Sequence, residues 1–244
     1  MTASFHPSAR PIVAFTGAFG SGKTEVAVNY CGAALANGKR VCLIDLDVVT
    51  PYFRVGDYRR ELEQEGIPVI AAPGALASFE LPALPPEIGG ALDSPDLHTV
   101  LDVGGDPVGA RLLATYADRI SKRGYDLWLV VNPYRPDTSD SRSVEEQARA
   151  IESSCGLRLT GVVANPNLGP MTQWLHIERG LRVVEKAAGS LGLPVVLAAV
   201  AQELANEPHG TAHALLPLRL MVRLPWGSER GRTGEARAED EHCG

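Results

Sequence analysis

A short segment near the start of the chain combines glycines, a lysine and a hydroxyl group at a fixed spacing. Residues 17–24 read Gly-Ala-Phe-Gly-Ser-Gly-Lys-Thr, which is the Walker A pattern G-x-x-x-x-G-K-T. Glycines let the backbone fold so tightly that several N–H groups point at one phosphate. In this pattern Lys23 brings a mobile positive charge to the β- and γ-phosphates, and the Thr24 hydroxyl can bind Mg²⁺. The segment therefore predicts a site for a nucleoside triphosphate.

The residues on both sides of this loop have the character that such a site requires. Residues 11–16 are an apolar run that predicts a buried strand leading into the loop. Residues 25–37 predict a helix whose positive end, at Glu25, points at the same phosphates. We therefore expect the nucleotide to be bound by the loop and the first residue of the helix: Gly17, Gly20, Ser21, Gly22, Lys23, Thr24 and Glu25.

Acidic residues end two further apolar runs. Asp45 and Asp47 end one of them, and Asp102 lies near the end of another, just before Gly104 and Gly105. An acidic residue on an apolar strand followed by glycines is the Walker B arrangement. There the carboxylate can hold Mg²⁺ through water while a flexible turn approaches the γ-phosphate. The sequence thus predicts a metal-directing role for Asp102.

Apolar runs alternate with helical segments along most of the chain. The expected strands are 11–16, 41–47, 67–72, 99–105, 126–132, 159–165 and 194–200, with a half-buried edge strand at 217–225. The expected helices are 25–37, 57–65, 86–92, 109–122, 139–153 and 172–188. Continuous apolar strands separated by helices are typical of a parallel sheet covered on both faces. We predict a doubly wound, mostly parallel sheet with the three-layer α/β/α architecture of P-loop NTPases, which binds ligands at the carboxyl ends of its strands.

The length of 244 residues and the hydrophobic fraction of 45% fit one α/β domain. We expect a nucleotide-binding domain over residues 1–226 and a disordered tail over 227–244, which contains no large apolar side chain. Residues 73–94 are rich in Pro, Gly and Ala and form a long connection. Such a connection is either functional or a surface excursion without a role.

Composition narrows the class of protein. The net charge of −6 argues against a large nucleic-acid footprint, so we expect no strong nucleic-acid binding. The four cysteines are scattered and include no C-x-x-C pair, which favours a reducing, cytoplasmic location. We expect no signal peptide, because the N-terminus lacks an apolar core segment, and no membrane span, because no run approaches 18 apolar residues.

Taken together, these motifs resemble the MinD/ParA-like ATPases, over about residues 11–205. The resemblance rests on the loop at 17–24, the strand ending Ile44-Asp-Leu-Asp, the Asp102-x-Gly-Gly turn, and Asn165 after a later strand. The wider group also holds dethiobiotin synthetase and the cobyrinic-acid amidating enzymes. The resemblance implies ATP and Mg²⁺ as ligands, with Lys23 on the phosphates and Thr24 on the metal.

The same resemblance implies roles for four further side chains. Asp47 would orient or deprotonate the attacking water, and Asp45 and Asp102 would organise the metal. Asn165 would contact the edge of the adenine. Lys23, Asp47 and Asp102 are therefore the expected catalytic residues. Two simpler alternatives stay open: Asp45 as a strand-end carboxylate bound by backbone, and Asn165 as part of an Asn-Pro-Asn turn.

One departure from the group concerns a second lysine, which in its members follows the first loop glycine and crosses a dimer interface. In this chain that position is Ala18, so a homodimer stays an open expectation. We hypothesise that Arg54 or Arg111, each just past a motif strand, supplies the missing charge.

The leading functional hypothesis is a Mg²⁺-dependent ATPase in which hydrolysis switches residues 48–54 and 104–108 between two conformations read by an unidentified protein partner. The alternative is a small-molecule kinase or ATP-dependent ligase of the dethiobiotin synthetase or cobyrinic-acid amidating type. In that case residues 73–94 could cover the acceptor. A third hypothesis is an assembly module in which ATP is structural. A GTPase is disfavoured, because Asn165 is followed by Pro166 and no N-K-x-D motif is present.

Overall fold

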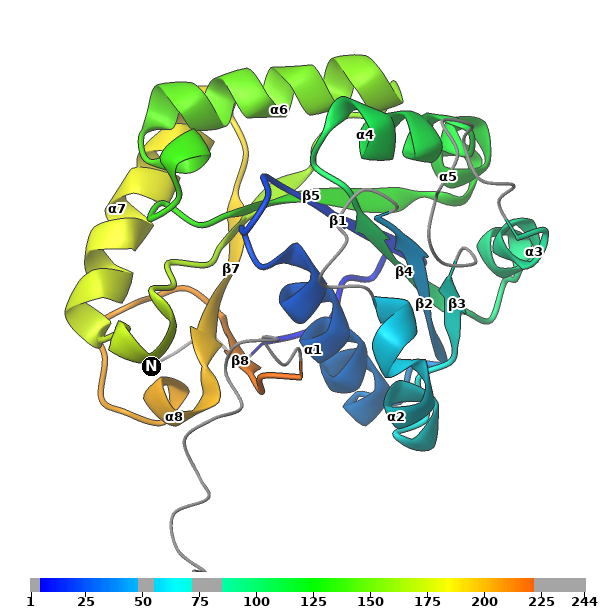
Figure 1. Ribbon diagram of the computed structural model, residues 1–244, viewed down its shortest axis with the longest axis horizontal. Helices are drawn as coiled ribbons and strands as arrows, with labels where there is room; N and C mark the ends of the chain where they lie inside the picture. The colour runs from blue at the N-terminus through cyan, green and yellow to red at the C-terminus, as the bar shows by residue number, and fades with distance from the viewer. Residues whose placement is uncertain (1–4, 48–54, 72–84, 222–244) are drawn as a thin grey trace, which may run out of the picture.

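One eight-stranded sheet forms the centre of the molecule (Figure 1). The computed structural model describes residues 5–47, 55–71 and 85–221. Within them every pair of neighbouring strands is parallel, and the strand order is β3-β2-β4-β1-β5-β6-β7-β8. The strands are β1 Ile12–Thr16, β2 Val41–Leu46, β3 Val69–Ala71, β4 His98–Val103, β5 Tyr125–Val131, β6 Gly161–Ala164, β7 Val195–Ala201 and β8 Leu215–Leu218.

Helices cover both faces of this sheet, so the predicted three-layer α/β/α architecture is confirmed. Figure 1 shows α1 and α2 on one side of the sheet and α4 and α6 on the other. Each face buries its own apolar cluster, one with α1 and α2 and one with α3 to α7. The helices are α1 Lys23–Ala36, α2 Arg59–Gln64, α3 Glu87–Asp93, α4 Pro107–Ala114, α5 Ala117–Arg123, α6 Ser141–Cys155, α7 Trp174–Leu191 and α8 Gln202–Ala205.

The position of β1 decides where the functional residues meet. β1 lies between β4 and β5, and the chain continues from β1 through α1 to β2 on the far side of β4. Connections therefore leave β1 and β5 in opposite directions, which opens a crevice at the carboxyl ends of these strands. Residues 17–22 emerge at this crevice, together with the residues that follow β2, β4, β5 and β6.

One predicted helix is wrong in extent. Residues 109–122 were expected to form a single helix, but the chain forms α4 and α5 with a break at Thr115 and Tyr116. Tyr116 has φ −110° and its N–H bonds to the carbonyl of Leu113, so the α-helical ladder is interrupted there. A β-branched residue followed by an aromatic residue has low helix propensity, and Tyr116 packs against the core instead.

The predicted edge strand is also displaced. β8 covers Leu215–Leu218 instead of beginning at Pro217, and the expected alternation stops after Leu218 because Leu220 is 74% exposed. The chain leaves the sheet at Arg219, where the N–H bonds to Asn29 and the guanidinium pairs with Glu65. These contacts with α1 and the end of α2 replace further strand pairing. The remaining alternating positions lie outside the described residues, as does the proposed tail 227–244.

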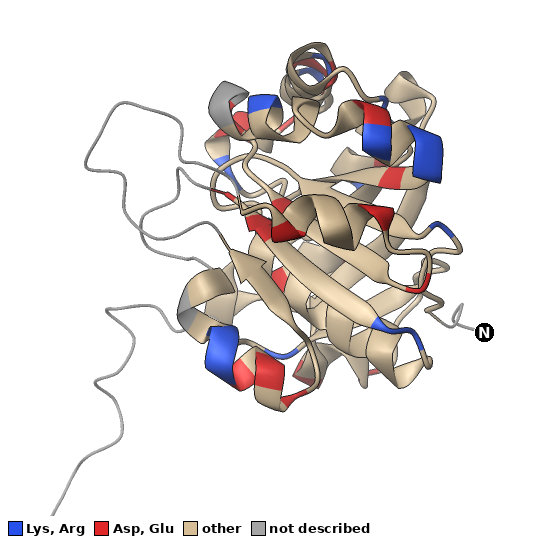
Figure 2. Cartoon of the chain, turned by 90° about the vertical axis from the view of Figure 1, so that its right-hand side faces the viewer, with Lys and Arg blue, Asp and Glu red and all other residues tan. Residues whose placement is uncertain are grey.

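Charged side chains are dispersed over the helices. In the view of Figure 2, acidic and basic segments are interspersed and do not gather into one basic band. Within the described ranges, no helix has the length and apolar character needed to cross a membrane.

A buried polar network fixes the N-terminal segment at the edge of the sheet opposite the crevice. The Tyr30 hydroxyl accepts a hydrogen bond from the Ser8 N–H at 2.9 Å and lies 3.1 Å from Nε2 of His98. The Ser8 hydroxyl in turn donates to Asp126. His98 is only 4% exposed, and burial lowers its pKa to about 4, with the charges of Lys39 and Arg123 acting in the same direction.

We predict that His98 makes the folded state sensitive to acid. Its pKa is lower in the folded chain than the value of about 6.5 in the unfolded chain, so the unfolded state binds the proton first. The free energy of unfolding should therefore fall as pH drops from about 6.5 to about 4, by about 2–3 kcal/mol. Urea unfolding measured between about pH 6.5 and pH 4 should show that His98→Gln abolishes this fall in the free energy of unfolding. Tyr30→Phe should lower stability at every pH and keep the slope, because burial causes the shift. An unchanged slope in His98→Gln would contradict the assignment.

Candidate nucleotide-binding site

The loop at residues 17–22 connects β1 to α1 and has the shape of an anion cradle. The Ser21 N–H bonds to the Ala18 carbonyl at 3.0 Å, which closes a tight turn inside the loop. Gly22, at the N-cap of α1, has φ 85°, a left-handed conformation that disfavours any other residue. A Cβ at this position would lie 2.3 Å from Nδ2 of Asn165. Glycine at 22 is thus required by both its backbone conformation and its surroundings.

Lys23 is buried at the base of this loop and forms an ion pair. Its Nζ lies 2.7 Å from Oδ2 of Asp47, and the two residues are 6% and 4% exposed. Burial alone would lower the pKa of Lys23, but the carboxylates of Asp102 and Asp47 outweigh it and raise the pKa above its usual value. The lysine is therefore charged, and Asp47 holds it beside the loop.

Thr24 contacts a second carboxylate. Its hydroxyl donates to Oδ2 of Asp102 at 2.6 Å, which links the start of α1 to the end of β4. Asp45 lies opposite Asp102 in the register of β2 and β4. Burial raises the pKa of both carboxyl groups, and the charge of Asp102 raises that of Asp45 further. Asp45 also accepts backbone N–H bonds, from Asp47 at 3.0 Å and from Gly56 at 3.4 Å.

These oxygen atoms suit Mg²⁺. Among the described residues no donor reaches Oδ1 of Asp102, so this buried oxygen is left without a hydrogen bond. Mg²⁺ prefers hard oxygen ligands and is usually held by one or two carboxylates together with phosphate and water. Within the described part of the chain no group of three His, Cys, Asp or Glu residues could hold a metal. The Thr24 hydroxyl and the Asp45 and Asp102 carboxylates therefore fit an ion that arrives with a phosphate.

Asn165, which follows β6, lies against the loop. Its Nδ2 donates to the Ser21 carbonyl at 2.7 Å, and the residue is 3% exposed. Its Oδ1 is buried and has no hydrogen-bond partner among the described residues. The side chain expected at the adenine edge is thus anchored to the phosphate loop by its nitrogen, while its oxygen is available to a donor.

Two residues of the site were missed by the sequence analysis. Asn132, directly after β5, is 2% exposed and bonds across to the next loop, with Nδ2 donating to the Asn167 carbonyl at 2.9 Å. Its Oδ1 accepts the N–H groups of Tyr134 and Asn167. Arg135, in the same loop, donates from Nε to the Gly20 carbonyl at 3.0 Å. A polar residue at the end of a buried strand could have identified Asn132, but no sequence signal marks Arg135.

Other expected residues have different surroundings. The Glu25 carboxylate accepts the Met221 N–H at 2.5 Å, so its side chain contacts the segment that follows β8. The Ser21 hydroxyl is buried and has no partner among the described residues. Arg111 lies on the exposed surface of α4. Arg54, the other arginine expected to supply charge, lies outside the described residues, as does most of the connection 73–94.

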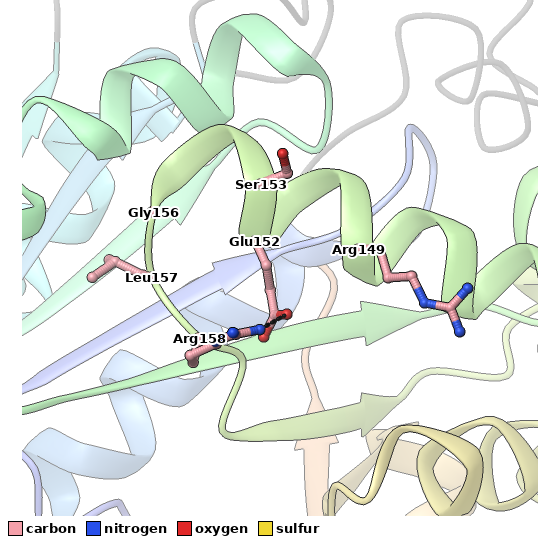
Figure 3. Close-up of a pocket in the computed structure, with 6 residues that line it drawn as sticks. All are labelled: Arg149, Glu152, Ser153, Gly156, Leu157 and Arg158. Atoms are coloured by element: carbon pink, nitrogen blue, oxygen red, sulfur yellow. Dashed lines mark hydrogen bonds and ion pairs between the residues drawn. The ribbon is translucent and has the colours of Figure 1, made fainter.

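A separate hollow of about 360 Å³ lies at the end of α6, where the chain turns toward β6 (Figure 3). Because α6 runs from the carboxyl end of β5 to the amino end of β6, this hollow is at the sheet edge opposite the loop. Its charged groups are paired, with Arg158 3.0 Å from Glu152 and Arg149 3.2 Å from Glu145. It is lined by Arg149, Glu152, Ser153, Gly156, Leu157 and Arg158.

Comparison with known proteins agrees with this geometry. The sequence profile of the CobQ/CobB/MinD/ParA nucleotide binding domain matches residues 12–189. The chain belongs to this family. The match extends from β1 through most of α7 and so includes the loop, both acidic strand ends, and Asn165. The resemblance to MinD/ParA-like proteins is therefore confirmed, and the chain is a P-loop nucleotide-binding protein. A search of curated proteins gave no significant match.

Solved structures share the fold of this family member at low sequence identity. Chloroplast FtsY from Physcomitrella patens has a TM-score of 0.54 at 16% identity, and the match covers 84% of this chain and 64% of the FtsY chain. Cell division protein FtsY from Thermotoga maritima has a TM-score of 0.53 at 17% identity, and the match covers 84% of this chain and 67% of that protein. The signal recognition particle receptor FtsY from Elizabethkingia anophelis, in complex with GDP, has a TM-score of 0.51 at 15% identity, and the match covers 86% of this chain and 63% of that protein. The chain thus spans between 63% and 67% of these proteins.

We predict opposite effects of alanine at two glycines of the same segment. Gly22→Ala should lower the free energy of unfolding by about 1–3 kcal/mol, because of its left-handed φ and the contact with Asn165. Gly32→Ala, inside α1 with no atom within 4 Å of the added Cβ, should raise it by about 0.5–1 kcal/mol. Urea unfolding of the nucleotide-free protein measures both. A Gly22→Ala protein as stable as the wild type would disprove the described loop geometry.

We also predict that Asn132 is required for the stability of the crevice. Asn132→Ala removes the partners of one carbonyl and two N–H groups, all of them partly buried, so the free energy of unfolding should fall by about 1–3 kcal/mol. Asn206→Ala removes a single exposed bond to the Gln202 carbonyl and should change stability by less than about 0.5 kcal/mol. Equal losses in the two variants would show that Asn132 does not link the two loops.

Proposed function

We propose that this protein binds ATP with Mg²⁺ and hydrolyses it as a conformational switch for a partner protein. The observation that carries the proposal is the pairing of both functional residues of the loop with carboxylates from neighbouring strands. Lys23 contacts Asp47 after β2, and Thr24 contacts Asp102 at the end of β4. A positive charge, a hydroxyl and acidic groups therefore surround the amino end of α1, which itself favours a phosphate.

In the proposed mechanism the ion pair of Lys23 is exchanged when the nucleotide binds. The ammonium leaves Asp47 and contacts the β- and γ-phosphates, where it stabilises the charge of the transition state. Asp47, freed from the lysine, orients the attacking water and accepts its proton. Thr24, Asp45 and Asp102 would hold Mg²⁺, which neutralises phosphate charge when bound.

The orientation of the Asn165 amide supports ATP over GTP. Its nitrogen must face the Ser21 carbonyl, because only the NH₂ group can donate to that oxygen. Its oxygen, which has no hydrogen-bond partner among the described residues, is then the end that can act as an acceptor. Adenine offers a donor amino group at position 6, whereas guanine has an acceptor oxygen there. An acceptor in this place therefore favours adenine.

The turn after β4 supports a switch. Gly105 lies so close to the first residue of the loop that a Cβ there would be 1.8 Å from the Gly17 carbonyl. A change at the γ-phosphate can therefore move this turn directly. We propose that residues 104–108, together with residues 48–54 outside the described ranges, present the nucleotide state to the partner. A homodimer is one form that this partner can take.

The remaining parts of the proposal concern organisation and location. We propose that residues 1–226 form the nucleotide-binding domain and that 227–244 form a tail outside it. Cys31, Cys42 and Cys155 are buried free thiols, which favours a reducing compartment and therefore the cytoplasm.

We predict that the wild type binds ATP with Mg²⁺ at least about tenfold more tightly than GTP, which corresponds to about 1.4 kcal/mol for one well-placed hydrogen bond. Isothermal titration calorimetry measures both affinities. Lys23→Ala should weaken ATP binding by about 100-fold or more, because it removes the charge at the phosphates. Asp47→Asn should keep ATP binding within about threefold and lower turnover by about 10²–10⁴-fold.

The matched control is Lys186→Ala, which removes an exposed lysine of α7 and should change neither binding nor turnover. Equal affinity for GTP would refute the role given to the Asn165 oxygen. Full turnover in Asp47→Asn would refute the proposed base. If a folded wild-type protein bound no nucleoside triphosphate with Mg²⁺, the proposed function would be refuted as a whole.

A further inference from the structure

The phosphate loop has a structural requirement on its outer side. When successive backbone N–H groups turn inward toward one anion, the carbonyl groups between them turn outward. Each of these carbonyls needs a hydrogen-bond donor, which is either a protein group or water, and a protein donor also fixes the direction of the carbonyl. The donors that satisfy them therefore determine how well the loop keeps its shape when no nucleotide is present.

Four loop carbonyls have identified donors, and two of these donors are side chains from other loops. The Gly22 carbonyl accepts the Val26 N–H of α1 at 3.0 Å. The Ala18 carbonyl accepts the Ser21 N–H within the loop itself. The Ser21 carbonyl accepts Nδ2 of Asn165, and the Gly20 carbonyl accepts Nε of Arg135 at 3.0 Å. The two side-chain donors come from the segments after β6 and β5. The outer side of the loop is thus held by the neighbouring half of the sheet.

Arg135 is placed for this role by its own loop. Its N–H bonds to the Asn132 carbonyl at 3.0 Å, and its carbonyl accepts the Thr138 N–H at 3.1 Å. The side chain lies along Gly20, where a Cβ would be 3.2 Å from Nε and 3.6 Å from both Cδ and Cζ. Although Arg135 is exposed, it forms no ion pair with any residue that the structure describes. Its Nε therefore faces the loop, and no carboxylate of the described residues neutralises its charge.

We propose that Arg135 is a positioning residue for the phosphate loop. Through the Gly20 carbonyl it keeps the loop amides aimed inward, and its guanidinium adds positive charge behind the loop of the same chain. The position after the first loop glycine, Ala18, carries no charge, so Arg135 supplies charge to the loop from within the subunit. The effect on affinity rests on the proposed nucleotide binding, whereas the effect on loop shape exists without any ligand.

The first test measures loop shape in the nucleotide-free protein. Hydrogen exchange of the amides of residues 18–24 is compared among the wild type, Arg135→Ala and Arg149→Ala. Arg149 is the matched control, because it is an exposed arginine on α6, at the opposite edge of the sheet. Arg135→Ala should speed exchange in the loop by about 5- to 20-fold and leave the sheet unchanged, because one charge-assisted bond is lost. Arg149→Ala should change neither.

The second test measures nucleotide affinity by calorimetry with ATP and with ADP, each with Mg²⁺. The loop amides surround the β-phosphate, which both nucleotides carry, so Arg135→Ala should weaken both by the same factor of about 5–20. The melting temperature of the nucleotide-free protein should stay within about 2 °C of the wild type, because the substituted side chain is exposed.

The outcomes separate this proposal from the proposed function. Unchanged loop exchange in Arg135→Ala overturns the positioning role, whatever the affinity for nucleotides. A loss confined to ATP also overturns it, because that result indicates direct contact with the γ-phosphate. If Arg135→Ala speeds loop exchange but the wild type binds no nucleotide, the positioning role of Arg135 is supported and the proposed function is refuted instead.

Discussion

The structure depends on a buried imbalance of charge at the carboxyl ends of β2 and β4. Asp45, Asp47 and Asp102 meet one lysine, Lys23, and all four residues are at most 6% exposed to solvent. Fully ionised, the carboxylates exceed the lysine by two charges. Burial raises the pKa of Asp45 and Asp102 above their usual values, and the neighbouring carboxylates raise both further. Because these values exceed those of the unfolded chain, the two groups oppose folding at neutral pH, and this opposition fades as pH falls through their folded pKa. A divalent cation relieves the same excess without any proton.

The second constraint is geometric and follows from the direction of the peptide groups in the loop. Inward amides require outward carbonyls, and those of Gly20 and Ser21 are bound by Arg135 and Asn165. Both donors follow strands on the β5 side of β1, whereas the carboxylates lie at the carboxyl ends of strands on the β4 side. The loop is therefore held in shape from one half of the sheet and supplied with charge partners from the other. This division explains why the site lies at the point where the strand order reverses.

Local patterns were enough to predict much of this arrangement. The strands of the parallel sheet and the loop at 17–24 are marked by short sequence signals, since apolar runs and glycine spacing act over a few residues. The break between α4 and α5 was not predicted, because it depends on how Tyr116 packs against the core. Arg135 was not predicted either, since its role depends on a contact with Gly20 across 115 positions of the chain. Contacts of this kind are created by the fold and leave no local pattern.

The ion pair of Lys23 and Asp47 links these constraints to the proposed switch. The Lys23 ammonium lies at the base of the loop, 2.7 Å from Oδ2 of Asp47. A phosphate in the loop would attract the same ammonium, so the proposed binding acts on the ion pair of Asp47. Asp47 directly precedes residues 48–54, while Gly105 contacts the loop at Gly17. The nucleotide can therefore act on both segments through adjacent residues, and no conformational signal has to cross the sheet.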